Sequence, residues 1–156
     1  MADYDDALIG EFGLLLGAAT RLERLAARAF EEECGISHAM FEALLHLDRL
    51  DRVEDEPTMG RLADAMVLTS GGMTRLADRL VRLELVRRYS SPVDRRVQLA
   101  ELTETGRAKL AEAKAVHTAT LRRLYAAPLS TDERTALAAA LDILNRTARA
   151  ELGTLH

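Results

Sequence analysis

Apolar residues recur three and four positions apart through most of the chain, the spacing that places them on one face of a helix. The first such stretch spans residues 5–34, and Gly35 after it is suited to a left-handed helix cap. Its stripe comprises Leu8, Phe12, Leu15, Leu16, Ala19, Leu22, Ala26, Ala29 and Phe30. Ser37 then caps a second helix that we expect to reach about Leu50, before an acidic turn that ends at Pro57.

Two further helical segments, residues 59–66 and 70–83, are short and separated by a tight turn. The second begins with hydroxyl groups that can cap it and glycines that leave its first turn bare, namely Thr69, Ser70, Gly71 and Gly72. Its apolar stripe is Met73, Leu76, Ala77, Leu80 and Leu83, and a separate face has Arg75, Arg79 and Arg82. Two short helices, the second with exposed backbone donors and an arginine face, are the pattern of a helix-turn-helix.

Beyond these helices the period changes from helical to alternating, which predicts two strands at residues 86–90 and 95–100. Residues 91–94 between them have turn-forming side chains. The resulting hairpin has Arg95 and Arg96 at its tip, directly behind the helix-turn-helix. We therefore expect a winged helix.

The long helices at the two ends of the chain have apolar stripes that a small winged helix cannot cover. One is predicted over residues 103–126, with His117 on its apolar stripe as a satisfied core or interface residue; Pro128 breaks it. Ser130 and Glu133 have the spacing of a capping box and begin the last helix. A two-fold dimer would bury these stripes and place two recognition helices roughly 34–36 Å apart. The expected fold is mainly α with a small β-hairpin wing, in which residues 35–102 form the winged helix-turn-helix DNA-binding domain and residues 1–34 and 103–156 the helical dimerisation region.

The net charge of −4 is unevenly distributed along the 156 residues. Residues 1–56 contain 14 acidic and 5 basic residues, residues 57–104 contain 6 and 8, and residues 105–156 contain 5 and 8. Within residues 71–96 there are 7 arginines against 3 acidic residues. Because charges are screened beyond about 10 Å at ordinary salt, this local excess decides whether phosphate can be contacted. The acidic total does not exclude DNA.

The composition and the missing motifs exclude several other classes of function. A chain with 48% hydrophobic and 29% charged residues, no apolar run of membrane length and no signal region is expected to be a folded cytoplasmic protein. No nucleophile–base pair, phosphate loop or metal motif is present, so we expect neither enzymatic activity nor a cofactor or metal. His38 and His46 lie about two turns apart on one helix, and a metal there would need ligands from elsewhere. Cys34 follows three glutamates, which would raise the pKa of its thiol and disfavour a redox role.

Five segments together resemble the MarR family of winged-helix transcriptional regulators. They are Pro57-Thr-Met-Gly-Arg-Leu-Ala-Asp-Ala65, Leu68-Thr-Ser-Gly-Gly-Met-Thr-Arg-Leu-Ala-Asp-Arg-Leu80, Leu85-Val-Arg-Arg88, Asp94-Arg-Arg96 and Leu102-Thr-Glu-Thr-Gly-Arg107. The resemblance implies a homodimer that binds double-stranded DNA, often as a ligand-responsive repressor of a pseudo-palindromic operator. The chain departs from the family's pattern in two places, with Glu84 where glycine is usual and Ala100 where a larger aliphatic residue is common.

The resemblance also assigns roles within the DNA-binding region. The residues expected to meet the major groove are Ser70, Gly71, Gly72, Thr74, Arg75 and Arg79. Arg95 and Arg96 would reach the adjacent minor groove, and Asp94 would hold a wing arginine by a salt bridge. The alternative for the arginine face is a solvated surface in which Asp78 pairs with arginines along the helix.

A small aromatic effector is a further partner that the resemblance implies, bound near the first, second and fifth helices. Residues that could line such a pocket are Phe12, His38, Met40, Phe41 and His46, although core packing explains the apolar ones equally well. The rival function is a small-molecule or redox sensor with little intrinsic DNA binding.

Overall fold

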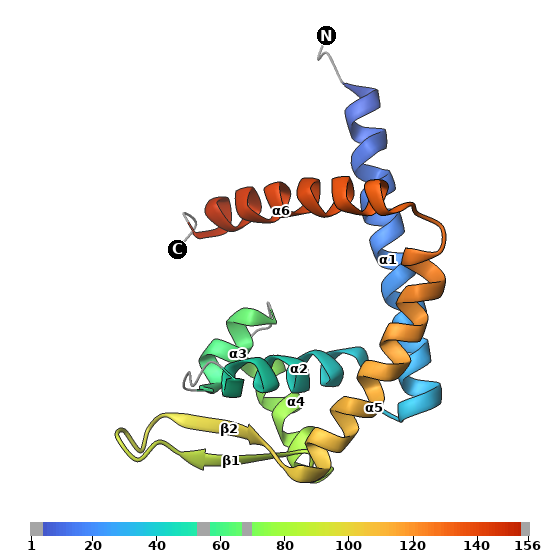
Figure 1. The fold of residues 1–156 in the computed structure, drawn as a ribbon. Helices are drawn as coiled ribbons and strands as arrows, with labels where there is room; N and C mark the ends of the chain where they lie inside the picture. The colour runs from blue at the N-terminus through green and yellow to red at the C-terminus, as the bar shows by residue number, and fades with distance from the viewer. Residues whose placement is uncertain (1–4, 53–56, 67–69, 154–156) are drawn as a thin grey trace. The chain divides into compact units, whose positions relative to one another are not determined.

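The computed structural model describes residues 5–52, 57–66 and 70–153, except for the side chain of Ser70. They form two compact units, Met1–His117 and Thr118–His156. The elements are α1 (Asp6–Cys34), α2 (His38–Arg52), α3 (Met59–Ala65), α4 (Ser70–Arg82), β1 (Val86–Ser90), β2 (Gln98–Leu102), α5 (Glu104–Leu121), the π-helix η1 (Arg122–Ala126) and α6 (Thr131–Gly153) (Figure 1). The expected class, mainly helical with one antiparallel hairpin, is confirmed.

Several predicted helix ends are confirmed by their caps. Gly35 ends α1 in the left-handed region, with φ 66°. The Ser37 hydroxyl accepts a hydrogen bond from the Met40 backbone N–H at 3.3 Å. In the second unit, Ser130 and Glu133 form the expected reciprocal capping box, each accepting from the other's backbone N–H at 3.2 and 2.7 Å. The predicted cap at the start of α4 lies outside the described residues, because Thr69 and the Ser70 side chain are not described.

The predicted helix over residues 103–126 is wrong in its last turn. It is α-helical only to Leu121, and residues 122–126 form the π-helix η1. The backbone N–H of Ala127 then donates to the carbonyl of Arg122 at 2.9 Å, five residues back. No described helix has the length and apolar content that crossing a membrane requires.

The core of the first unit is built around Phe30, near the end of α1. Its ring is fully buried and stacks on Phe41 of α2 at a centroid distance of 4.5 Å. His117 of α5 stacks on the same ring at 5.3 Å, and His38 of α2 at 5.7 Å. Met40 and Phe41 are therefore core residues, whereas Phe12 is 59% exposed.

His117 is not satisfied as the sequence predicted. Its Nδ1 atom is buried and has no hydrogen-bond partner among the described residues. Burial lowers the pKa of His117, and the neighbouring His38 lowers it further, while Glu42 acts in the opposite direction.

We expect the free energy of unfolding to fall when the pH drops below about 6.5, the ordinary histidine pKa. With a lowered pKa in the folded state, the unfolded chain binds more protons, so stability rises with pH and is lost on acidification. Urea unfolding at pH 7.5 and 5.5 measures this loss, which should be smaller in His117→Phe than in the wild type. His46→Phe is the control and should lose as much stability between the two pH values as the wild type. An equally large loss in His117→Phe would contradict the assignment of this pH dependence to His117.

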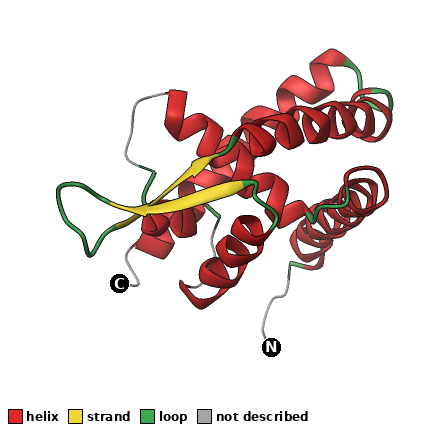
Figure 2. Ribbon diagram, turned by 90° about the horizontal axis from the view of Figure 1, so that it is seen from below, coloured by secondary structure: helices red, strands yellow, loops and turns green. Residues whose placement is uncertain are grey.

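The wing differs from its prediction in where the second strand begins. β1 spans the predicted residues 86–90, but β2 spans Gln98–Leu102 instead of 95–100, with Tyr89 paired to Leu99. The chain between the strands is closed by hydrogen bonds from Ser91 N–H to the Val97 carbonyl and from Val97 N–H to the Asp94 carbonyl, both 2.9 Å. Arg95 and Arg96 therefore lie in the loop between the two strands. Figure 2 shows this loop, in green, at the tip of the hairpin.

Glu84 connects α4 to the wing in a conformation that usually selects glycine. Its φ is 57°, in the left-handed region. Its N–H donates to the Val81 carbonyl at 2.9 Å, and the Leu85 N–H donates to the Leu80 carbonyl at 3.0 Å. These two bonds are those of a Schellman cap, whose left-handed position is usually occupied by glycine because it has no Cβ atom.

Replacing Glu84 with glycine should raise the free energy of unfolding by about 1 kcal/mol, because the left-handed conformation costs a side-chain-bearing residue about 1–2 kcal/mol. Glu84→Ala removes the same charge without freeing the backbone, and should give no such gain. The urea unfolding midpoints of the two variants test this. An equal change of midpoint in both variants would contradict the left-handed cap conformation of Glu84.

The start of α5 approaches this cap closely. The Thr103 hydroxyl donates to the Glu84 carbonyl at 2.6 Å and accepts from the Gly106 N–H at 2.9 Å. The Thr103 N–H donates to the Leu85 carbonyl at 3.1 Å. Gly106 is buried against that carbonyl, where a Cβ atom would lie 1.9 Å from the oxygen. The end of α4, the start of β1 and the start of α5 are thus held at one junction.

Candidate nucleic-acid interface

Helix α4 presents its arginines on a surface that the core does not use. Met73, Ala77 and Leu80 are buried, while Arg75, Arg79 and Arg82 are exposed. Among the described residues, no carboxylate or carbonyl accepts a hydrogen bond from these three guanidinium groups. Their charge is therefore available to an anionic partner.

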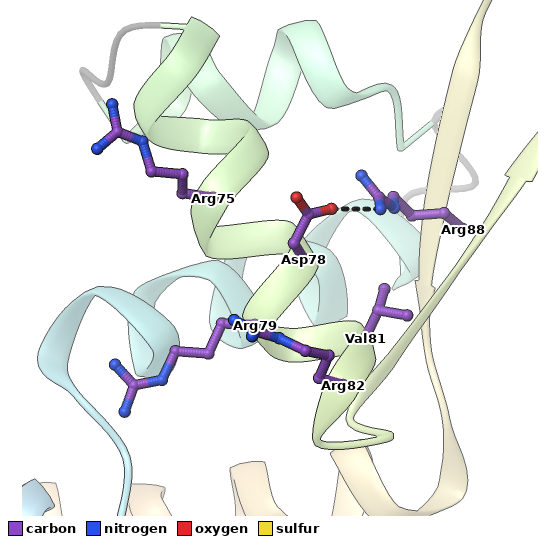
Figure 3. A pocket seen from close by; sticks show the side chains of 6 residues that line it. All are labelled: Arg75, Asp78, Arg79, Val81, Arg82 and Arg88. Carbon is purple, nitrogen blue, oxygen red and sulfur yellow. Dashed lines mark hydrogen bonds and ion pairs between the residues drawn. The ribbon is translucent and has the colours of Figure 1, made fainter.

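These arginines border an open hollow of about 680 Å³, which we call the arginine-face hollow. Its lining residues are Arg75, Asp78, Arg79, Val81, Arg82 and Arg88. In Figure 3, Arg75 and Arg79 extend away from the hairpin, and Arg88 reaches from β1 to Asp78. With four cations and one anion, the hollow has an excess of positive charge.

The start of α4 is open, as the glycines predicted. Gly71 is exposed, and a Cβ atom added to it would meet no described atom within 4 Å. Thr74 is exposed beside a second hollow of about 250 Å³, which Arg88 and Gln98 of the wing also line. Thr74 and Arg75 thus face different hollows, on two sides of one helix.

The tip of the wing presents two more arginines. Asp94 accepts hydrogen bonds from the backbone N–H, Nε and Nη2 of Arg96 at 3.0, 3.1 and 3.0 Å. These bonds lower the pKa of the Asp94 carboxyl group. The salt bridge expected at Asp94 is confirmed, and Arg96 is the arginine it holds, with a side chain still 91% exposed. Arg95 is exposed beside it.

Sequence reasoning missed the role of Arg88. The alternative interpretation of the arginine face paired Asp78 with arginines of its own helix, but the Asp78 carboxylate accepts a hydrogen bond from Nη2 of Arg88 on β1 at 2.5 Å. The only available signal was an arginine at an exposed position of a strand packed beside α4.

Other candidate chemistry finds less support in the structure. Cys34 is buried, and burial is the main cause that raises the pKa of its thiol, as the sequence predicted in direction. Within the described ranges, no three His, Cys, Asp or Glu side chains are placed to hold a metal ion. Neither of the two hollows beside α4 is lined by any of the residues suggested for an effector pocket.

The sequence profile of the MarR family matches residues 35–97. Over 60 residues the chain is 40% identical to the HTH-type transcriptional regulator MhqR of Bacillus subtilis, a match that covers 38% of this chain. The matched segment spans only 41% of that relative's length.

Solved structures resemble the chain over more of its length. AbsC, a MarR family transcriptional regulator from Streptomyces coelicolor, has a TM-score of 0.85 at 23% identity, covering 96% of this chain and 99% of its own. A cysteine variant of MarR from E. coli, complexed with operator DNA, has a TM-score of 0.76 at 25% identity, covering 92% and 99%. The whole fold, and not only the winged helix, is thus similar to regulators of this family.

Proposed function

Because the chain contains a MarR-family winged helix, we propose that it is a dimeric, sequence-specific DNA-binding transcriptional regulator. The observation that supports this most is the set of exposed arginines on α4 and the wing tip, which lie on the two elements that winged helices offer to DNA. The E. coli relative was solved in complex with operator DNA, which supports DNA binding by this chain.

In the proposed complex α4 enters the major groove, which is wide enough to admit a helix. Ser70, Thr74, Arg75 and Arg79 contact bases and flanking phosphates, and the bare turn at Gly71 and Gly72 allows close approach of the backbone. Arg95 and Arg96 contact the minor groove and its phosphates. Asp94 limits the motion of the Arg96 guanidinium before DNA is bound, and so reduces the entropy lost on binding.

Dimerisation is proposed from the apolar surface that the long helices leave uncovered. Leu8, Phe12 and Leu16 on α1 are more than half exposed and recur every four residues. In α6, no residue of Thr131–Gly153 is buried. Because helices in proteins gain most of their stability by packing an apolar face, we propose that a second copy of the chain covers these faces.

Replacing Phe12 with glutamate should convert the dimer to a monomer, because it places a charge in the proposed apolar interface. Sedimentation velocity measures the mass, and operator binding should be lost with it. Glu11→Gln, at the neighbouring position of α1, serves as the matched surface control. A dimer that persists in Phe12→Glu would place the interface elsewhere.

On the basis of the family resemblance, we also propose that the protein is a repressor and that it responds to a small aromatic effector. Selection of duplexes from a random pool at low salt tests the function as a whole. We expect enrichment of an inverted repeat whose half-sites lie about one helical turn apart. A pool with no enriched sequence would contradict sequence-specific binding and favour the sensor alternative.

A further inference from the structure

Asp78 is the one acidic side chain among the described residues that line the arginine-face hollow. It lies on the third turn of α4, between Arg75 and Arg79 in sequence, with a side chain 46% exposed. A carboxylate at this position faces the same surroundings as the arginines. On a surface that contacts phosphates, the negative charge of Asp78 opposes DNA binding.

Asp78 forms an ion pair with Arg88, which gives this carboxylate a specific role. Arg88 comes from β1, its side chain is 33% exposed, and it donates to Asp78 at 2.5 Å. It also borders both hollows that flank α4. Arg88 is therefore a cation close to the proposed interface that is both held by a carboxylate and two-thirds covered. It differs in this from Arg75 and Arg79, which no described carboxylate holds, and from Arg96, whose side chain stays 91% exposed in its pair with Asp94.

Binding to arbitrary DNA and binding to an operator depend on such a cation differently. Affinity for arbitrary duplexes comes almost wholly from phosphate neutralisation and counterion release, whereas an operator also offers base contacts. A carboxylate that removes one cation from phosphate contact therefore favours the operator, because an arbitrary duplex has no base contacts with which to compensate for the lost phosphate contact.

We propose that Asp78 is a specificity-determining residue: it holds Arg88 against α4 and opposes phosphate contact, which suppresses binding to duplexes that lack the operator. This inference rests on the proposed DNA-binding function. The competing role for Asp78 is a base contact, in which the carboxylate accepts a hydrogen bond from a cytosine amino group.

The test compares Asp78→Asn, Arg88→Gln and the double variant with the wild type, on the selected operator and on a scrambled duplex. Glu32→Gln is the matched control, because it makes the same charge change at an exposed Arg–carboxylate pair on α1, with Arg28 at 2.7 Å. Fluorescence anisotropy between 50 and 200 mM salt gives the affinity and its salt dependence for each protein.

We expect Asp78→Asn to bind the scrambled duplex more tightly and to lose discrimination. One newly neutralised phosphate per protomer steepens the salt slope by about 0.9, so affinity should fall about 3.5-fold more per protomer over this fourfold rise in salt. The double variant has the net charge of the wild type and should return to its slope, and Glu32→Gln should not differ from the wild type.

Three results would overturn the inference. Equal behaviour of Asp78→Asn and Glu32→Gln would show that the position of the carboxylate is immaterial. Loss of operator affinity in Asp78→Asn, with scrambled binding unchanged, would assign Asp78 to a base contact. A steepened slope that persists in the double variant would exclude Arg88. A wild type that binds neither duplex would instead refute the proposed function, and this inference with it.

Discussion

Replacing Gly106 with alanine is expected to lower the free energy of unfolding by about 3 kcal/mol. The added Cβ would lie 1.9 Å from the carbonyl oxygen of Leu85 and 2.9 Å from its carbon. Both are backbone atoms, so no side chain can move aside to relieve the overlap. The start of α5 must therefore shift away from the junction that holds α4 and β1.

The same shift should weaken operator binding beyond the loss of stability, because Leu85 belongs to the cap that ends α4. Urea unfolding and operator titration measure the two effects. Gly13→Ala is the control: it is an exposed helical glycine of α1 with no described atom within 4 Å of an added Cβ, and it should gain up to about 1 kcal/mol. An unchanged unfolding midpoint in Gly106→Ala would contradict the close packing of Gly106 against the Leu85 carbonyl.

Replacing Arg75 with alanine is expected to reduce operator affinity by about 1–3 kcal/mol for each protomer, or about 2–6 kcal/mol for a dimer that uses both copies. Arg75 is exposed on α4 near its bare first turn and extends freely from the helix (Figure 3). A guanidinium group at this position can donate two parallel hydrogen bonds to the major-groove edge of one guanine. The loss should therefore be accompanied by relaxed preference at one base pair of each half-site.

Two other arginine variants separate this effect from charge alone. Arg95→Ala, at the wing tip, should weaken binding to operator and scrambled duplexes more evenly, because a phosphate contact has no base preference. Arg28→Ala removes the same charge from an exposed position of α1 and should leave both affinities unchanged. If Arg75→Ala lowered both affinities by the same factor, its proposed role in base recognition would be wrong.

The elements of the fold were predictable because their signals are local. The stripes and caps of α1, α2 and α6 depend on spacing within one helix, and Gly35, Ser37 and Ser130 act within a few residues of their own positions. The position of β2 was not predictable in the same way. The alternating pattern continues through Arg95 and Arg96, but hydrogen bonds of Asp94 and Ser91 hold those residues in the loop.

The candidate site was predictable in its arginines but not in their pairing. Periodicity alone separates Arg75 and Arg79 from the buried face of α4. The ion pair of Asp78 with Arg88 depends on how β1 packs on α4, and the two residues are ten positions apart on different elements. Glu84 is similar: a glutamate gives no local sign of a left-handed conformation, and bonds from both neighbouring elements impose it.

The salt dependence of binding to the selected operator tests the central claim most directly, that the arginines of α4 and the wing neutralise DNA phosphates. A dimer in which Arg79, Arg95 and Arg96 of each protomer contact phosphates should give a slope of log affinity against log salt of about −5, at about 0.9 for each contact. The operator should remain tighter than a scrambled duplex at every salt concentration. A slope near zero, or equal affinity for the two duplexes throughout, would contradict the account.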